Sequence, residues 1–196
     1  MNIIANRCHG AYIYRDILKC EYQNPFVWSR MSKQSYNYLF SHYYDLDFSN
    51  IIVSKHVCDN TWCLDVLIDD VITVIYPHVL FDARCNKPTI KDNNVYYNRP
   101  WLLVCDSYEK RLMRMSETPI FIYLDIDNNE LCENFELAKL ANTLKRKCLF
   151  ITTRKYEETE YVKTINVIQQ DWSNLNWWNY IRENHSNQLL NYLMCK

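Results

Sequence analysis

Glycine is almost absent from this chain: its 196 residues include one, Gly10. Gly10 follows a short apolar run at residues 3–5, where a predicted strand gives way to a predicted helix. A lone glycine at such a turn indicates a positive φ or the close approach of a ligand. Cys8 and His9 lie in the same turn, so residues 8–10 form the first candidate site.

The sequence also lacks an excess of charge and a long apolar run. Its 22 basic and 23 acidic residues give a net charge of −1, which provides no field to attract nucleic acid or an anionic membrane. No apolar run approaches the roughly 18 residues that span a bilayer, and the apolar start at residues 2–5 is too short for a signal peptide. We therefore expect a cytoplasmic protein with no nucleic-acid partner and no membrane span, while peripheral membrane association stays open.

The nine cysteines are an odd number. Together with the missing signal peptide, this argues against a disulfide scaffold and favours reduced thiols. His56, Cys58 and Cys63 have a loosely metal-like spacing, but a closed zinc site usually takes its fourth ligand from a second close pair. Only Cys85 lies nearby, so the spacing gives zinc little support.

Helix-like and strand-like segments alternate along the chain. Apolar residues make up 48% of it, enough for a core, and no linker or repeat divides the sequence. The pattern predicts an α/β fold: a single Rossmann-like three-layer domain over residues 1–196 with a largely parallel sheet. Apolar spacing predicts helices at 11–19, 32–43, 101–115, 132–144 and 175–193, and strands at 3–5, 51–53, 63–68, 71–76, 120–124, 148–152 and 164–168.

The middle of the chain contains two further features. The Asp69-Asp70 pair between two predicted strands indicates a β-hairpin near residues 63–76. Residues 81–100 are polar and rich in turn formers, so they predict a long loop of the kind that often covers a site. The helix predicted after this loop has a basic face that includes Arg111 and Arg114.

Cys8 and His78 are the candidates for nucleophilic chemistry. Cys8 precedes a predicted helix N-terminus, where free N–H groups and the helix dipole lower the pKa of a thiol. A structural role for Cys8 stays open, because free cysteines pack well in cores. His78 follows the strand at 71–76, and Asp82 or another acid is expected to orient its ring. Catalytic groups gather at the carboxyl ends of strands in α/β sheets, so Cys8 and His78 can meet if their strands are parallel neighbours.

Asp125-Ile-Asp127 follows the predicted strand at 120–124. Two carboxylates at this spacing resemble the Asp-x-Asp signature with which many sugar-nucleotide glycosyltransferases hold a divalent cation against a diphosphate. The same residues also suit an acidic loop that caps the next helix. The predicted metal ligands are Asp125 and Asp127, and the predicted cofactors are Mg²⁺ or Mn²⁺ with a nucleotide-sugar.

Several short motifs resemble known families when they are taken in order. They are Asn6-x-Cys8-x-Gly10, Asn24-Pro25-Phe26, Asp70-Val71 with an apolar strand leading to His78, and Tyr108-Glu-Lys-Arg111-x-x-Arg114. Together they span nearly the whole chain and resemble an uncharacterised bacterial family of exopolysaccharide biosynthesis proteins with a domain of unknown function. This chain has Ala11 where that family commonly has a second glycine.

The early segment around Cys8 and Trp28 also resembles a family described as papain-like cysteine peptidases. In that family the first cysteine is the presumed nucleophile and a later histidine is its partner. The resemblance implies these roles for Cys8 and His78.

The leading hypothesis is an enzyme of bacterial surface polysaccharide biosynthesis, a glycosyl- or sugar-modifying transferase. Its phosphate-containing or lipid-linked donor is expected at His9 and Gly10, with Arg111 and Arg114 neutralising the phosphate. One alternative is a cysteine-dependent hydrolase or acyltransferase that uses Cys8 and His78. The other alternative is a non-catalytic scaffold of a polysaccharide assembly complex.

Overall fold

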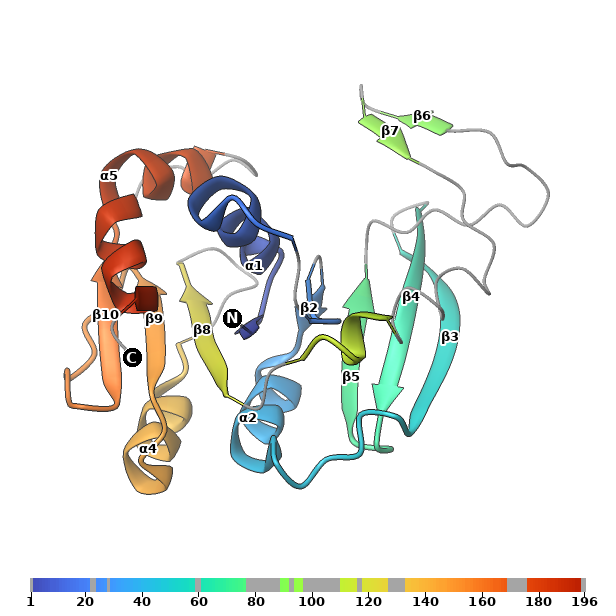
Figure 1. The fold of residues 1–196 in the computed structure, drawn as a ribbon, viewed down its shortest axis with the longest axis horizontal. Helices are drawn as coiled ribbons and strands as arrows, with labels where there is room; N and C mark the ends of the chain where they lie inside the picture. The colour runs from blue at the N-terminus through green and yellow to red at the C-terminus, as the bar shows by residue number, and fades with distance from the viewer. Residues whose placement is uncertain are drawn as a thin grey trace.

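The computed structural model of the protein contains helices, a parallel sheet and an antiparallel sheet (Figure 1). This composition confirms the predicted α/β class. The described residues are 2–21, 24–27, 29–58, 61–76, 89–91, 94–96, 110–115, 118–126, 133–168 and 176–194.

The parallel sheet has four strands in the order β1-β8-β9-β10. They are β1 (Asn2–Ala5), β8 (Pro119–Asp125), β9 (Cys148–Thr152) and β10 (Val162–Asn166). Each strand is parallel to its neighbour, and Figure 1 shows β8, β9 and β10 pointing the same way. The carboxyl ends of the strands therefore lie at one edge of the sheet, which we call the carboxyl edge.

The second sheet is antiparallel, with the order β2-β5-β4-β3. The β4–β5 connection confirms the predicted hairpin, and its two turn residues, Asp69 and Asp70, have φ values of 51° and 56°. Two successive positive φ angles are typical of tight hairpin turns, and aspartate tolerates that region better than most residues. The strands outside the parallel sheet are β2 (Arg30–Met31), β3 (Ile51–Cys58), β4 (Thr61–Ile68), β5 (Ile72–Tyr76), and the separate pair β6 (Thr89–Lys91) and β7 (Asn94–Tyr96).

Helices cover both faces of the parallel sheet, which explains why its strands are nearly continuous apolar runs. Successive strand residues point to opposite faces, so Ile3 and Ile4 enter different core clusters. On the Ile3 face lie α1 (His9–Tyr12), the π-helical segment η1 (Ile13–Leu18) that continues it, and α5 (Asn176–Met194). On the Ile4 face lie α2 (Lys33–His42) and α4 (Phe135–Leu144).

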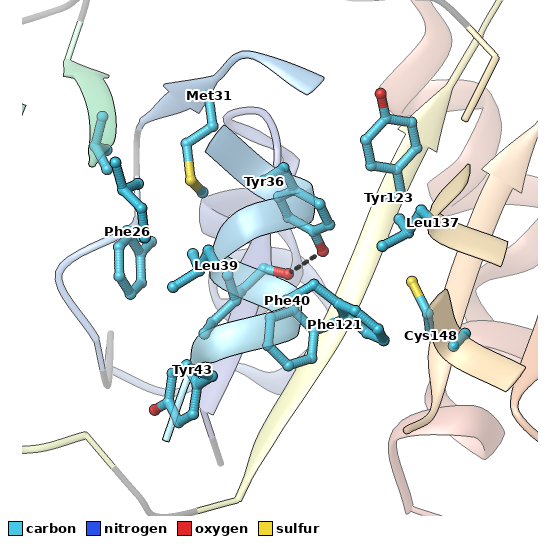
Figure 2. Close-up of a cluster of buried hydrophobic side chains, with 14 of the residues drawn as sticks. Phe26, Met31, Tyr36, Leu39, Phe40, Tyr43, Phe121, Tyr123, Leu137 and Cys148 are labelled. Carbon is cyan, nitrogen blue, oxygen red and sulfur yellow. Dashed lines mark hydrogen bonds between the residues drawn. The ribbon is translucent and has the colours of Figure 1, made fainter. Parts of the chain in front are cut away.

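Helix α2 joins the cores of the two sheets. Its buried Tyr36 and Leu39 belong to one cluster that includes Ile4 of the parallel sheet and Val74 of the antiparallel sheet. Figure 2 shows side chains of α2 directed toward β8. The Tyr36 hydroxyl also lies 3.0 Å from the backbone carbonyls of Ile4 and Ile122, which share its single proton. The two sheets therefore share a continuous apolar interior.

Asn6 continues the parallel sheet beyond the last residue of β1. Its side-chain amide donates to the Leu124 carbonyl at 3.2 Å and accepts from the Leu124 N–H at 2.8 Å, as a strand backbone would. The backbone carbonyl of Asn6 accepts from the Met31 N–H of β2 at 3.0 Å. One buried asparagine thus connects both sheets.

The outer edge of β1 is closed by side chains. The Ile3 N–H donates to the Tyr14 hydroxyl at 2.9 Å, and Asn24 Nδ2 donates to the Ile3 carbonyl at 2.7 Å. Asn24 Oδ1 also accepts from the Phe26 N–H at 2.9 Å. These bonds give the Asn24-Pro25-Phe26 motif a structural role, because they occupy backbone groups that an edge strand would otherwise leave open.

Some predicted elements differ in extent from those observed. Strand β3 runs to Cys58, beyond the predicted end at residue 53, because pairing with β4 continues along its whole length. The region predicted as a loop at 81–100 contains β6 and β7. Of the helix predicted at 101–115, only residues 110–115 are described.

Candidate functional site

The turn after β1 and the end of β8 are neighbours at the carboxyl edge. β1 and β8 pair in parallel with Ala5 opposite Ile122, so the segments that follow the two strands leave the sheet at the same edge. The bonds from Asn6 to Leu124 tie the two ends together. The structure therefore brings the predicted turn at residues 8–10 and the predicted Asp125 to the same edge.

Cys8 lies at the start of α1 and is partly buried. Burial raises the pKa of its thiol, while the positive charges of Arg7 and Arg30 act in the opposite direction. The net shift is opposite to the lowering expected at a helix N-terminus. The physical reason is that burial removes the solvation of the thiolate, and this loss outweighs the favourable interactions of the charged form.

His9 is fully buried, and neither of its ring nitrogens makes a hydrogen bond. Burial lowers its pKa to about 3, although the nearby Ile122 backbone acts in the opposite direction. The imidazole is therefore neutral at pH 7. Its ring packs edge-on against Trp177 of α5, with ring centroids 6.2 Å apart. In this position His9 supplies no positive charge to a phosphate.

Gly10 lies within α1 and does not have a positive φ, so that expectation is wrong. A Cβ at this position would lie 3.1 Å from the Cβ of Ala5. Such a contact is tighter than ordinary packing. The absence of a side chain therefore lets the start of α1 approach the end of β1.

Asp125 is fully buried at the end of β8, and both of its carboxylate oxygens are engaged. Arg154 Nε lies 3.3 Å from Oδ1 in an ion pair. Oδ2 accepts from Thr152 at 3.3 Å and from the Tyr156 hydroxyl at 2.5 Å. Burial raises the pKa of Tyr156, so the phenol keeps the proton that it donates to Asp125. Thr152 is the last residue of β9, and Arg154 and Tyr156 follow it.

The polar network continues to the starts of α2 and α4. The Tyr156 hydroxyl accepts from the Asn134 N–H at 2.9 Å. Asn134 exchanges side-chain hydrogen bonds with Asn37 of α2, at 2.8 and 3.1 Å. Arg154 also lies 3.4 Å from the Glu133 carboxylate. The carboxyl edge thus joins β8, β9, α2 and α4 through hydrogen-bonded side chains.

Arg154, Tyr156 and Asn134 were not among the site residues predicted from the sequence. Arg154 could have been found from the sequence, because it closely follows the predicted strand at 148–152. Asp125 was predicted as a site residue for the same reason, its position at the carboxyl end of a strand. Tyr156 and Asn134 carried no comparable signal, because their contacts connect residues that are distant in sequence.

The residues described around Asp125 do not fit a divalent cation. Both carboxylate oxygens already accept hydrogen bonds, and the Arg154 guanidinium would repel a cation at the same group. Within the described ranges, no group of three or more histidine, cysteine or acidic side chains has a metal-binding arrangement. Asp127 lies outside the described residues, so the predicted Asp-x-Asp metal pair stays a prediction.

Arg111 and Arg114 lie on the short segment at 110–115. Arg114 is 3.6 Å from the Glu21 carboxylate and donates to the Lys110 carbonyl at 3.1 Å. Leu112 of the same segment packs against the core cluster that contains α2 and the antiparallel sheet. Figure 1 shows the segment in front of β5, away from the tip of β8. Their predicted role in phosphate binding stays a prediction.

His78 and Asp82 lie outside the described residues. Strand β5, which precedes His78, pairs with β2 and β4 in the antiparallel sheet, whereas β1 pairs with β8. The parallel-neighbour arrangement considered for Cys8 and His78 is therefore not the one observed. Their partnership stays a prediction.

Neither a protein-family model nor a curated protein matches this chain. The resemblance to exopolysaccharide biosynthesis proteins thus stays a prediction. Within the described ranges, no helix has both the length and the apolar character needed to cross a bilayer.

Proposed function

We propose that the protein is a transferase of bacterial surface polysaccharide biosynthesis that takes a phosphate-containing sugar donor at the carboxyl edge. The observation that carries this proposal is the parallel pairing of β1 with β8, which puts the turn at residues 8–10 beside Asp125. Ligands of α/β sheets characteristically bind at this edge. The polysaccharide pathway itself rests on the resemblance of the sequence motifs.

Positive charge near Cys8 supports a phosphate-containing donor. Arg7 follows β1 and Arg30 lies in β2, and the charges of both act on the Cys8 thiol. Guanidinium groups bind phosphate oxygens through paired hydrogen bonds and keep their charge at every physiological pH. In this proposal Arg7 and Arg30 bind the donor phosphate, and His9 and Gly10 shape the turn beneath it.

The proposal includes a Rossmann-like, three-layered fold. The helices on both faces of the parallel sheet support it. The protein works in the cytoplasm on a nucleotide-sugar or lipid-linked donor. Peripheral contact with a membrane is compatible with this chemistry. Arg154 balances the buried charge of Asp125 and holds the β8 end in place for the donor.

The test is thermal stabilisation of the wild-type protein by UDP, GDP, CDP and inorganic pyrophosphate, each with and without Mg²⁺. We expect at least one of these ligands to raise the unfolding temperature, and the Arg30→Gln variant to lose that rise. Arg182→Gln is the control, because Arg182 is an exposed residue of α5 that pairs with Glu183 at 3.6 Å. Absence of stabilisation by every ligand would overturn the proposal.

A cysteine-dependent hydrolase or acyltransferase is the second candidate, favoured by the two arginines that act on the Cys8 thiol. The raised pKa of Cys8 opposes it, because the reactive form is the thiolate. Iodoacetamide labelling at pH 7 separates the two effects, with the exposed free Cys20 as the internal control. Slower labelling of Cys8 than of Cys20 counts against this mechanism, and faster labelling supports it.

A further inference from the structure

Phe135 is a half-exposed aromatic side chain at the carboxyl edge. It is the first residue of α4, and 48% of its surface is exposed. Its ring lies 5.0 Å from that of Tyr156, at an angle of 42°. Tyr156 is itself stacked on the buried Phe150 at 4.4 Å. The rings of Phe135, Tyr156 and Phe150 therefore pack one after another, with Phe135 at the exposed end.

Polar groups flank this ring. The Glu133 carboxylate lies 3.4 Å from the Arg154 guanidinium. Arg154 belongs to the segment after β9, which also carries Tyr156. The carboxylate of Glu136, the next residue in the chain, accepts from Asn37 of α2 at 3.1 Å. The Glu133 side chain is 53% exposed and the Arg154 side chain 30% exposed, so both are accessible to a ligand.

The charges around Phe135 favour an uncharged ligand. Arg154 is paired with the carboxylates of both Asp125 and Glu133, and Lys33 donates to the Glu133 backbone carbonyl. These cationic groups are therefore already engaged, whereas carboxylate oxygens accept hydrogen bonds from hydroxyl groups. An aromatic face with hydrogen-bonding groups at its rim suits a ring that has an apolar C–H face and polar edges.

We propose that Phe135 is the stacking residue of an acceptor subsite for a neutral sugar ring, with Glu133 and Arg154 binding its hydroxyl groups. This inference rests on the proposed transferase function, in which the charged donor lies near Arg7 and Arg30. The two sites share the carboxyl edge but differ in charge. The acceptor is thus a neutral glycan.

Saturation-transfer NMR with methyl glycosides of glucose, galactose, mannose, rhamnose and N-acetylglucosamine tests the subsite. At least one glycoside is expected to bind the wild-type protein, with the strongest transfer to protons on one face of the sugar. Phe135→Ala should weaken that binding about fivefold to tenfold, the effect of losing one aromatic contact. Phe135→Trp should retain it.

Leu144→Ala is the matched control, since Leu144 ends the same helix and is 42% exposed. Binding that is unchanged in Phe135→Ala, or a wild-type protein that binds none of the glycosides, overturns the acceptor subsite. The phosphate-ligand experiment reports separately on the donor. Stabilisation by a diphosphate without glycoside binding would leave the transferase proposal in place and remove only this subsite, whereas glycoside binding without any diphosphate effect would remove the donor.

Discussion

His9 is a neutral base enclosed in the core. The unfolded residue titrates near 6.5 and the folded one near 3, so between these pH values the unfolded state binds more protons. The stability contributed by neutral His9 is therefore complete above pH 6.5 and is lost as the pH falls toward 3. Between pH 3 and 6.5, we expect the unfolding free energy of His9→Leu to rise less steeply with pH than that of the wild-type protein. The difference in slope should be up to about 1.4 kcal/mol per pH unit.

Urea unfolding at a series of pH values measures that slope. His42→Leu is the control, because it makes the same substitution at a histidine that is exposed at the end of α2. An identical slope for His9→Leu and wild type would show that His9 does not titrate as its burial requires.

Asn6 is the second residue with a large expected effect. Asn6→Ala leaves the N–H and carbonyl of Leu124 without their partners inside the protein. We expect a loss of about 2–4 kcal/mol in unfolding free energy, because each unsatisfied buried group costs about 1–3 kcal/mol. Chemical denaturation measures the loss, and Asn166→Ala, at an exposed site, should change stability little. Equal stabilities for the two variants would contradict the bridging role.

At the scale of elements, β1 depends on residues outside its sheet. Tyr14→Phe removes the hydroxyl that accepts from the Ile3 N–H. We expect hydrogen exchange at Ile3 to accelerate and the unfolding free energy to fall by about 1–3 kcal/mol. Tyr38→Phe, at an exposed position of α2, is the matched control. Unaltered exchange at Ile3 would mean that another group protects this edge.

Elements with strong local signals were predicted well, and those defined by distant partners were not. Buried Leu149 and Ile151 lie in an apolar run that predicts β9 directly, and Asp69-Asp70 predicts the hairpin turn. The two-residue strand β2 has no such pattern, because it is defined by pairing with β5 and by the bond from Met31 to Asn6.

At the scale of the whole molecule, the shared cluster around α2 predicts that both sheets unfold together. Leu39→Ala leaves a cavity between them, and we expect a loss of about 2–5 kcal/mol. Native-state hydrogen exchange should then show equal decreases in protection for β4 and β9. Protection lost in one sheet alone would indicate two independent units. Ile52→Ala, at a position 55% exposed, serves as the control.

The sequence by itself determined the α/β class, the hairpin and the position of titratable side chains after the strands, because apolar spacing and turn chemistry are local properties. Only the tertiary structure decided that β1 pairs with β8, that β5 belongs to another sheet, and that Arg154 and Tyr156 occupy the oxygens of Asp125. Apolar spacing specifies which face of an element is buried, but the partner that covers it depends on how the whole chain packs.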